Sequence, residues 1–101
     1  MIRILHLDDD LSHHELTKVQ LSRLSDDMVL DYANSYQAAS SALKDDIYDC
    51  ILTDDQLLEN DGLELLKTLR TTGNLIPFVV LSEIYDDGKK SFREKAAVLP
   101  L

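Results

Sequence analysis

Short apolar runs alternate with segments of helical periodicity along most of the chain. The apolar runs predict strands at 2–7, 28–32, 48–53 and 78–81. Apolar residues spaced three or four apart predict helices at 12–24, 38–43 and 62–70. Because the strands are nearly continuously apolar and the connections are short, the pattern favours a parallel sheet covered on both faces. We therefore expect an α/β fold with a doubly wound parallel sheet.

The first predicted helix has a recognisable start. Ser12 followed three residues later by Glu15 is the signature of a capping box. Leu16, Val19 and Leu24 are spaced to share one face of this helix. That face is expected to pack on the sheet.

The pattern is less regular after Ser82. Residues 86–95 fit a fourth helix, and residues 96–101 fit a short fifth strand. Pro100 lies inside this last segment, and a strand that contains proline is restricted to a sheet edge.

Composition restricts the class of protein. The 101 residues suit one domain, and no apolar stretch reaches the ~18 residues of a membrane span. A net charge of −9, from 10 basic and 19 acidic residues, argues against nucleic acid as a partner. The single Cys50 excludes an internal disulfide and fits a reduced, cytoplasmic setting.

The three histidines are expected to differ in exposure. His6 is expected to be packed, whereas His13 and His14 are expected to face solvent.

Candidate chemistry gathers where the predicted strands end. In open α/β sheets, ligands bind at the carboxyl ends of the strands. Polar residues follow the four predicted strands at these ends: Asp8, Asp9 and Asp10, then Asn34, then Asp54 and Asp55, then Ser82 and Glu83. Converging carboxylates need a cation, and Mg²⁺ suits a small, open acidic cluster. A carboxylate beside such an ion can attack phosphorus.

Four segments together resemble the receiver domain of response regulators of the two-component, chemotaxis-regulator type. Ile4-Leu-His-Leu-Asp-Asp-Asp10 resembles the first strand and acidic pair of that family, and Tyr48-Asp-Cys-Ile-Leu-Thr-Asp54 resembles its phosphoacceptor strand. Asp61-Gly-Leu-Glu-Leu-Leu-Lys-Thr-Leu-Arg70 and Pro77-Phe-Val-Val-Leu-Ser82 resemble the later helix and strand. The resemblance implies a flavodoxin-like sheet of order 2-1-3-4-5, with residues 1–101 as one receiver domain whose C-terminal end is truncated or degenerate.

The resemblance also implies a role for each site residue. Asp54 would be phosphorylated, and Asp9 would bind Mg²⁺ directly with help from Asp8 and the backbone carbonyl of Gln56. Ser82 would hydrogen-bond the phosphoryl group and act as the switch residue. The donor would be a sensor histidine kinase, and the response would pass to a fused or separate output domain. Such a chain is a phosphorylation-dependent signalling switch rather than an ordinary enzyme.

Two departures from the family leave a second interpretation open. The lysine that ends the family's fifth strand has no clear counterpart, since Lys95 falls on the presumed helix. Glu83 replaces a usually small residue. These changes are compatible with a degenerate pseudo-receiver that acts as a protein-interaction module.

A third interpretation is a magnesium-dependent aspartyl phosphatase. Asp8-x-Asp10-x-Ser12 resembles the nucleophile motif of haloacid dehalogenase-like enzymes. The resemblance implies Asp8 as the nucleophile, Asp10 as the acid/base, and Asp86 and Asp87 as the later metal pair. The chain is short for such an enzyme, and the motif does not explain Asp54.

Overall fold

The computed structural model describes residues 1–54, 61–85 and 92–98, and for 81–85 and 92–98 it defines the strands only. In chain order the elements are β1 (Ile2–Leu7), α1 (Leu11–Leu24), β2 (Met28–Ala33), α2 (Tyr36–Asp45), β3 (Cys50–Asp54), α4 (Leu63–Thr71), β4 (Phe78–Tyr85) and β5 (Phe92–Val98). All four strands and all three helices predicted from the periodic part of the sequence are present.

The strands form one sheet in the order β2-β1-β3-β4-β5, and β2, β1, β3 and β4 run parallel. The predicted α/β fold with a doubly wound parallel sheet is therefore confirmed for the order 2-1-3-4. Leu7 of β1 lies in register with Ala33 of β2 and with Thr53 of β3. These three strands consequently end at the same edge of the sheet, as a ligand site at their carboxyl ends requires.

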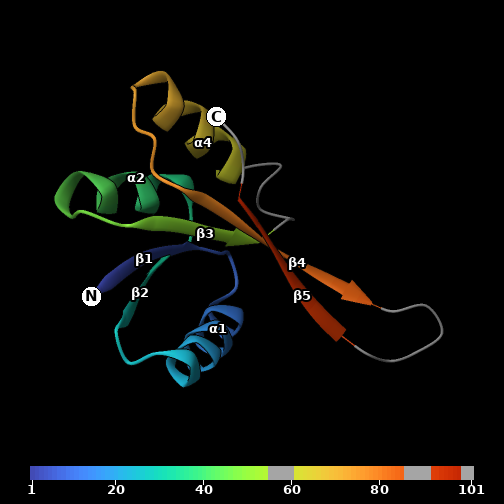
Figure 1. Cartoon of the computed structure of the whole chain (residues 1–101). Helices are drawn as coiled ribbons and strands as arrows, with labels where there is room; N and C mark the ends of the chain where they lie inside the picture. Colours follow the sequence, from blue (N-terminus) through green and yellow to red (C-terminus); the bar gives the residue numbers. More distant parts are fainter. Residues whose placement is uncertain (55–60, 86–91, 99–101) are drawn as a thin grey trace.

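The fifth strand differs from the prediction. β5 pairs with β4 in the antiparallel sense, and it begins at Phe92, inside the segment that was assigned to a fourth helix. A parallel fifth strand needs a crossover of about a dozen residues, whereas a short connection suffices for an antiparallel one. Only residues 86–91 separate the two strands. Beyond Leu81, the pairing of β4 within the described residues is with β5, and Figure 1 shows the two strands continuing as a ribbon past the rest of the sheet.

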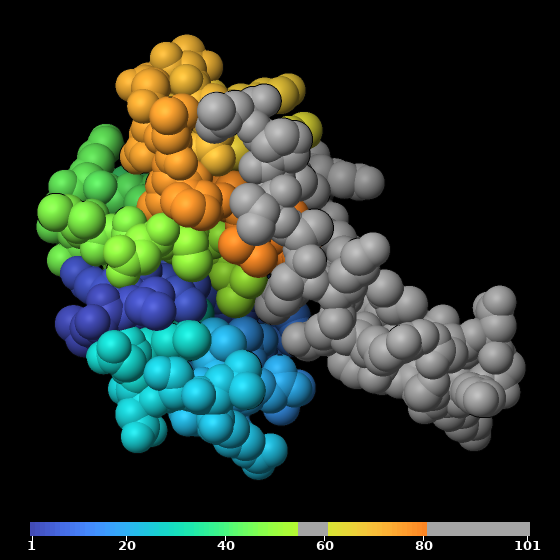
Figure 2. All heavy atoms as spheres, viewed as in Figure 1, coloured from blue at the N-terminus to red at the C-terminus, as the bar shows by residue number. Residues whose placement is uncertain are grey.

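Helices cover both faces of the sheet (Figure 1), and each face has its own apolar layer. On one face α2 and α4 contribute Ala39, Leu65 and Leu69 to a core built around Ile51 and Phe78. On the other face α1 contributes Leu21 to a smaller cluster around Ile4, Leu30 and Leu52. The space-filling view shows α1 and α4 as opposite layers of the molecule (Figure 2). In the described part of the chain, no helix combines the length and the apolar character of a membrane span.

Helix α1 packs on a different face from the predicted one. Its buried residues are His14 and Thr17, whereas Leu16, Val19 and Leu24 are 52%, 47% and 77% exposed. The predicted capping box is also wrong. The N-cap is Asp10, whose side chain accepts hydrogen bonds from the backbone N–H groups of the first turn.

A polar cluster links β1 and β2 to the residues that lead into β3, away from the edge at which the parallel strands end. The hydroxyl of Tyr48 donates to Asp31 Oδ2 at 2.7 Å, and Arg3 donates to the same oxygen at 3.0 Å. Burial and this bond raise the pKa of Tyr48 to about 12, so the phenol remains a donor. The bond from Tyr48, followed by that from Arg3, in turn lowers the pKa of Asp31.

Tyr48→Phe is expected to lower the free energy of unfolding by about 1 kcal/mol, because it removes a donor to a partly exposed carboxylate. Asp31 with a depressed pKa stabilises the fold above its unfolded value of 3.8, and this contribution is lost as the pH falls through its folded pKa. The difference between wild type and variant should therefore shrink in acid. Urea unfolding at several pH values measures it. Tyr36→Phe, which loses only a bond to the neutral Thr68, is the control and should show no such acid dependence.

Candidate functional site

Three aspartates meet at the carboxyl edge of the sheet. Asp8 follows β1 directly, Asp54 is the last residue of the adjacent β3, and Asp9 is next to Asp8 in the chain. One carboxylate oxygen from each of the three lies within 4.8 Å of the others. Asp8 is completely buried, Asp54 is partly buried and Asp9 is exposed. The predicted convergence of Asp8, Asp9 and Asp54 is therefore present, and the cluster opens to solvent on the side of Asp9.

The turn between β1 and α1 fixes the position of Asp8. Its backbone N–H extends the sheet by donating to Ala33 O at 3.0 Å. Its Oδ1 accepts the backbone N–H of Asp10 at 2.9 Å, and Asp10 then caps α1 through Ser12 N–H at 2.9 Å. Asp10 is thus used in capping the helix, which argues against the acid/base role given to it in the phosphatase interpretation.

The negative charge of the acidic residues changes the pKa of Tyr32 on the neighbouring strand β2. Burial raises the pKa of the Tyr32 phenol, and the charges of Asp8, Asp10 and Asp9 raise it further. Grouped carboxylates of this kind favour a cation. Their donor atoms are all oxygens, one of them in an exposed residue, which fits Mg²⁺ with its preference for carboxylates and retained waters.

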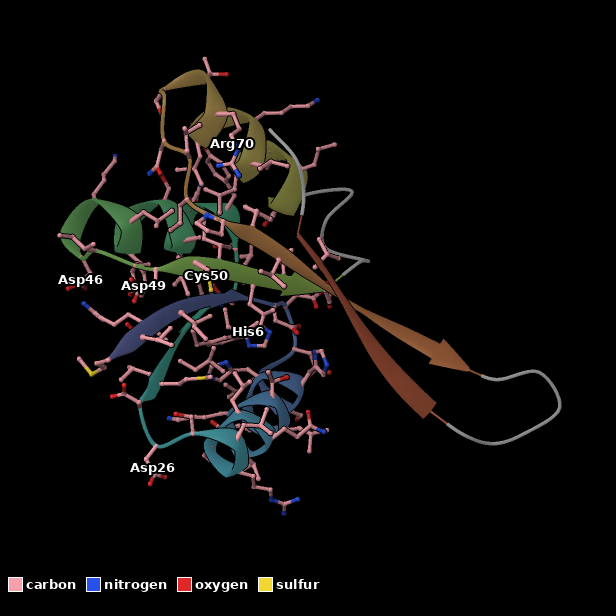
Figure 3. The ribbon with its side chains drawn as sticks, in the orientation of Figure 1. His6, Asp26, Asp46, Asp49, Cys50 and Arg70 are labelled. Carbon is pink, nitrogen blue, oxygen red and sulfur yellow. The ribbon has the colours of Figure 1, made fainter. Side chains whose placement is uncertain are left out.

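Beside the acidic cluster, histidines fill the layer between β1 and α1. His6 is fully buried as predicted, and Figure 3 shows its ring on the side of the sheet that faces α1. Its Nδ1 lies 2.9 Å from Nδ1 of His14, and burial lowers the pKa of His6 to about 4. His14 is only 5% exposed, and His13 contacts Asp8 Oδ2 through Nδ1. The prediction that His13 and His14 face solvent is therefore wrong.

The spacing of His6, Asp8 and His13 could have predicted this histidine layer, but the apolar residues of α1 pointed to another buried face. His6 lies on β1 and Asp8 directly follows this strand, two residues further along, so both side chains point to the same face. His13 lies in the first turn of the helix that covers this face. The sequence pattern also predicts no structural role for Asp61. In the structure its carboxylate accepts the backbone N–H of Tyr36 at 2.9 Å and so supports the start of α2.

For the other predicted site residues, the structure either gives a position on a strand or gives no description. Ser82 lies on β4, in register with Lys95 of β5, so Lys95 belongs to a strand and not to the helix expected for it. Glu83 lies opposite Glu94 in the same pair of strands. Gln56 is outside the described residues, as are Asp55 and the pair Asp86 and Asp87.

Comparison with known proteins gives consistent results at the level of family and fold. The family model for the response regulator receiver domain matches residues 4–97. The transcriptional regulatory protein MalR of Bacillus subtilis is 34% identical over 82 residues, which cover 81% of this chain and 35% of MalR. ZraR of Escherichia coli K12 is 30% identical over 81 residues, which cover 80% of this chain and 18% of ZraR. The chain thus spans about a third of MalR and less than a fifth of ZraR.

A solved structure supports the fold independently. The chemotaxis response regulator CheY4 of Vibrio cholerae superposes with a TM-score of 0.64 over 77% of this chain and 65% of CheY4. The two sequences are only 20% identical, so this likeness bears on the fold alone.

Proposed function

Because the chain belongs to the family of response regulator receiver domains, which serve two-component signalling, we propose that it accepts a phosphoryl group on Asp54. The donor is the phosphohistidine of a sensor histidine kinase. The observation that carries the proposal is the placement of Asp54 within 4.8 Å of the carboxylate oxygens of Asp8 and Asp9, at the carboxyl edge of the sheet.

The proposed reaction is an in-line phosphoryl transfer. A carboxylate oxygen of Asp54 attacks phosphorus, the new O–P bond forms as the P–N bond to the kinase histidine breaks, and the imidazole leaves with the electron pair. Asp8, Asp9 and Asp54 would hold Mg²⁺, which when bound would neutralise negative charge at the site of transfer. Asp8 can orient the site because its carboxylate is buried and held by the backbone of Asp10.

Phosphorylation then acts as an electrostatic switch. It adds about 1.5 to 2 negative charges at the sheet edge. In this proposal the backbone carbonyl of Gln56 completes the metal site, and the Ser82 hydroxyl donates a hydrogen bond to the phosphoryl group. Residues 1–101 act as one cytoplasmic receiver domain that passes the change to a fused or separate output domain, and the curated relatives carry further sequence beyond the region they share with this chain.

The test is to incubate the chain with Mg²⁺ and acetyl phosphate and to measure its intact mass. We expect the gain of one phosphoryl group in Mg²⁺, no gain in EDTA, and reversal by hydroxylamine, which cleaves acyl phosphates. No gain under any condition contradicts the phosphoacceptor proposal and supports the interaction module. Continuous hydrolysis of phosphate esters that persists without Asp54 but requires Asp8 would instead support the phosphatase.

A further inference from the structure

Two histidines surround the buried carboxylate of Asp8 on the side that faces α1. Nε2 of His6 lies 3.5 Å from Asp8 Oδ2, and Nδ1 of His13 contacts the same oxygen. One ligand atom from each of the three residues lies within 4.8 Å of the others. We propose that His6, Asp8 and His13 bind a divalent transition-metal ion of the Zn²⁺ class, and that this ion competes with Mg²⁺ for Asp8. The competition rests on the proposed function, whereas the binding does not.

The backbone presents these three side chains to one point. His6 and Asp8 are separated by two positions in extended chain, so both side chains leave the same face of β1. Helix α1 covers this face, and His13 belongs to its first turn. The His13 side chain is 18% exposed, whereas those of His6 and Asp8 are fully buried, so an ion reaches the cluster from the side of His13.

His6 offers an unused ligand atom. Although the ring is fully buried, its Nε2 makes no hydrogen bond within the described residues. Its Nδ1 lies 2.9 Å from Nδ1 of His14, and one of these two nitrogens must donate. When His6 donates, its Nε2 keeps a lone pair that is directed toward Asp8. A second hydrogen bond that fixes the ring in this way is the usual support of a metal-binding histidine.

The donor set selects the class of ion. Two imidazole nitrogens and one carboxylate suit Zn²⁺, Co²⁺ or Ni²⁺ better than Mg²⁺, which prefers oxygen donors. Ligand atoms ~2.0–2.2 Å from a tetrahedral Zn²⁺ lie about 3.4 Å from one another. The 3.5 Å separation of His6 Nε2 and Asp8 Oδ2 matches this spacing without a rearrangement of β1. His13 Nδ1 is in direct contact with the same oxygen, so its side chain must move outward and give up its proton for the ion to enter.

Competition follows from the position of Asp8 in both clusters. The acidic cluster consists of Asp8, Asp9 and Asp54, and the histidine cluster shares only Asp8 with it. Asp8 Oδ1 already accepts the backbone N–H of Asp10, so Oδ2 is the oxygen that faces an incoming ion. An ion held there by two imidazoles draws the Asp8 carboxylate away from the acidic cluster and places a second positive charge beside that cluster.

The binding is tested by titrating the metal-free full chain with Co²⁺ and following its visible absorption. We expect one Co²⁺ per chain, with bands typical of nitrogen ligation. His13→Gln, a change at a partly exposed position, should weaken Co²⁺ binding at least tenfold, and His6→Asn should do the same if it folds. Asp9→Asn is the matched control, because Asp9 belongs only to the acidic cluster, and its Co²⁺ affinity should stay within about twofold of wild type.

Equal Co²⁺ affinity in wild type and His13→Gln overturns the proposed site, as does a loss that occurs in Asp9→Asn instead. Competition is measured separately, in wild type and His13→Gln. The rate of Mg²⁺-dependent phosphorylation of each of these two proteins is compared with and without Zn²⁺. Zn²⁺ should slow the wild type at least tenfold and have a much smaller effect on His13→Gln. If wild type is never phosphorylated but Co²⁺ binds as described, the proposed function fails and the metal site stands. If phosphorylation proceeds and Zn²⁺ slows both proteins equally, the competition is refuted.

Discussion

Asp54→Asn is expected to abolish phosphorylation of the chain by acetyl phosphate in Mg²⁺. The substitution keeps the size of the side chain but replaces a nucleophilic carboxylate oxygen with a neutral amide. It also removes one of the three carboxylates that lie within 4.8 Å of one another, so Mg²⁺ should bind more weakly. Intact-mass measurement should show complete loss of the added phosphoryl group.

Asp45→Asn is the matched control for this experiment. Asp45 ends α2 and is exposed, and it is not part of the acidic cluster, so phosphorylation should continue at the wild-type level. Borohydride reduction of the phosphorylated wild type followed by peptide mass spectrometry locates the modified residue. Labelling of Asp54→Asn at the wild-type level would place the acceptor elsewhere and contradict the assignment of Asp54.

The acidic cluster was predictable because it depends on features that short-range patterns reveal. An apolar strand followed by aspartate occurs twice, at Asp8 and at Asp54, and adjacent parallel strands bring their carboxyl ends together. The adjacency of β1 and β3 itself came from resemblance to a family, since periodicity alone does not order strands in a sheet. The roles of Ser82 and Gln56 stay predictions.

The packing of α1 was not predictable from its apolar residues. Leu16 and Val19 suggested one buried face, yet the helix buries His14 and Thr17. The opposing position on β1 is His6, a buried polar ring whose Nδ1 pairs with His14. A buried polar group needs a polar partner, and the pattern of apolar residues carries no information about that requirement.

The direction of β5 depends on what links it to β4. The residues Phe92–Val98 show no apolar–polar alternation, and such a pattern would not in any case distinguish the two directions of a strand. The short connection 86–91 favours the antiparallel pairing that is observed. The helix that the residue pattern predicts at 86–95 is therefore wrong from Phe92 onward, where the chain forms a strand.

Ile51→Ala should cost more stability than any surface change in the chain. Ile51 is fully buried in β3, in register with Leu5 of β1 on one side and Phe78 of β4 on the other. All three side chains are 0% exposed and belong to the core under α2 and α4. Truncation leaves a cavity between strands whose spacing is fixed by their hydrogen bonds, so the site cannot collapse. The expected loss is about 2–5 kcal/mol, a large part of the ~5–15 kcal/mol typical of a native domain.

Ile47→Ala provides a comparison with the same chemical change at a nearby position. Ile47 is 87% exposed, so its truncation should change the free energy of unfolding by less than about 0.5 kcal/mol. Urea unfolding followed by far-ultraviolet circular dichroism measures both variants. If Ile51→Ala does not fold in water, Ile51→Val should still fold with a loss of about 0.5–1.5 kcal/mol. Similar losses for Ile51→Ala and Ile47→Ala would mean that β3 is not packed between β1 and β4, and the convergence of Asp8 and Asp54 would then lose its structural basis.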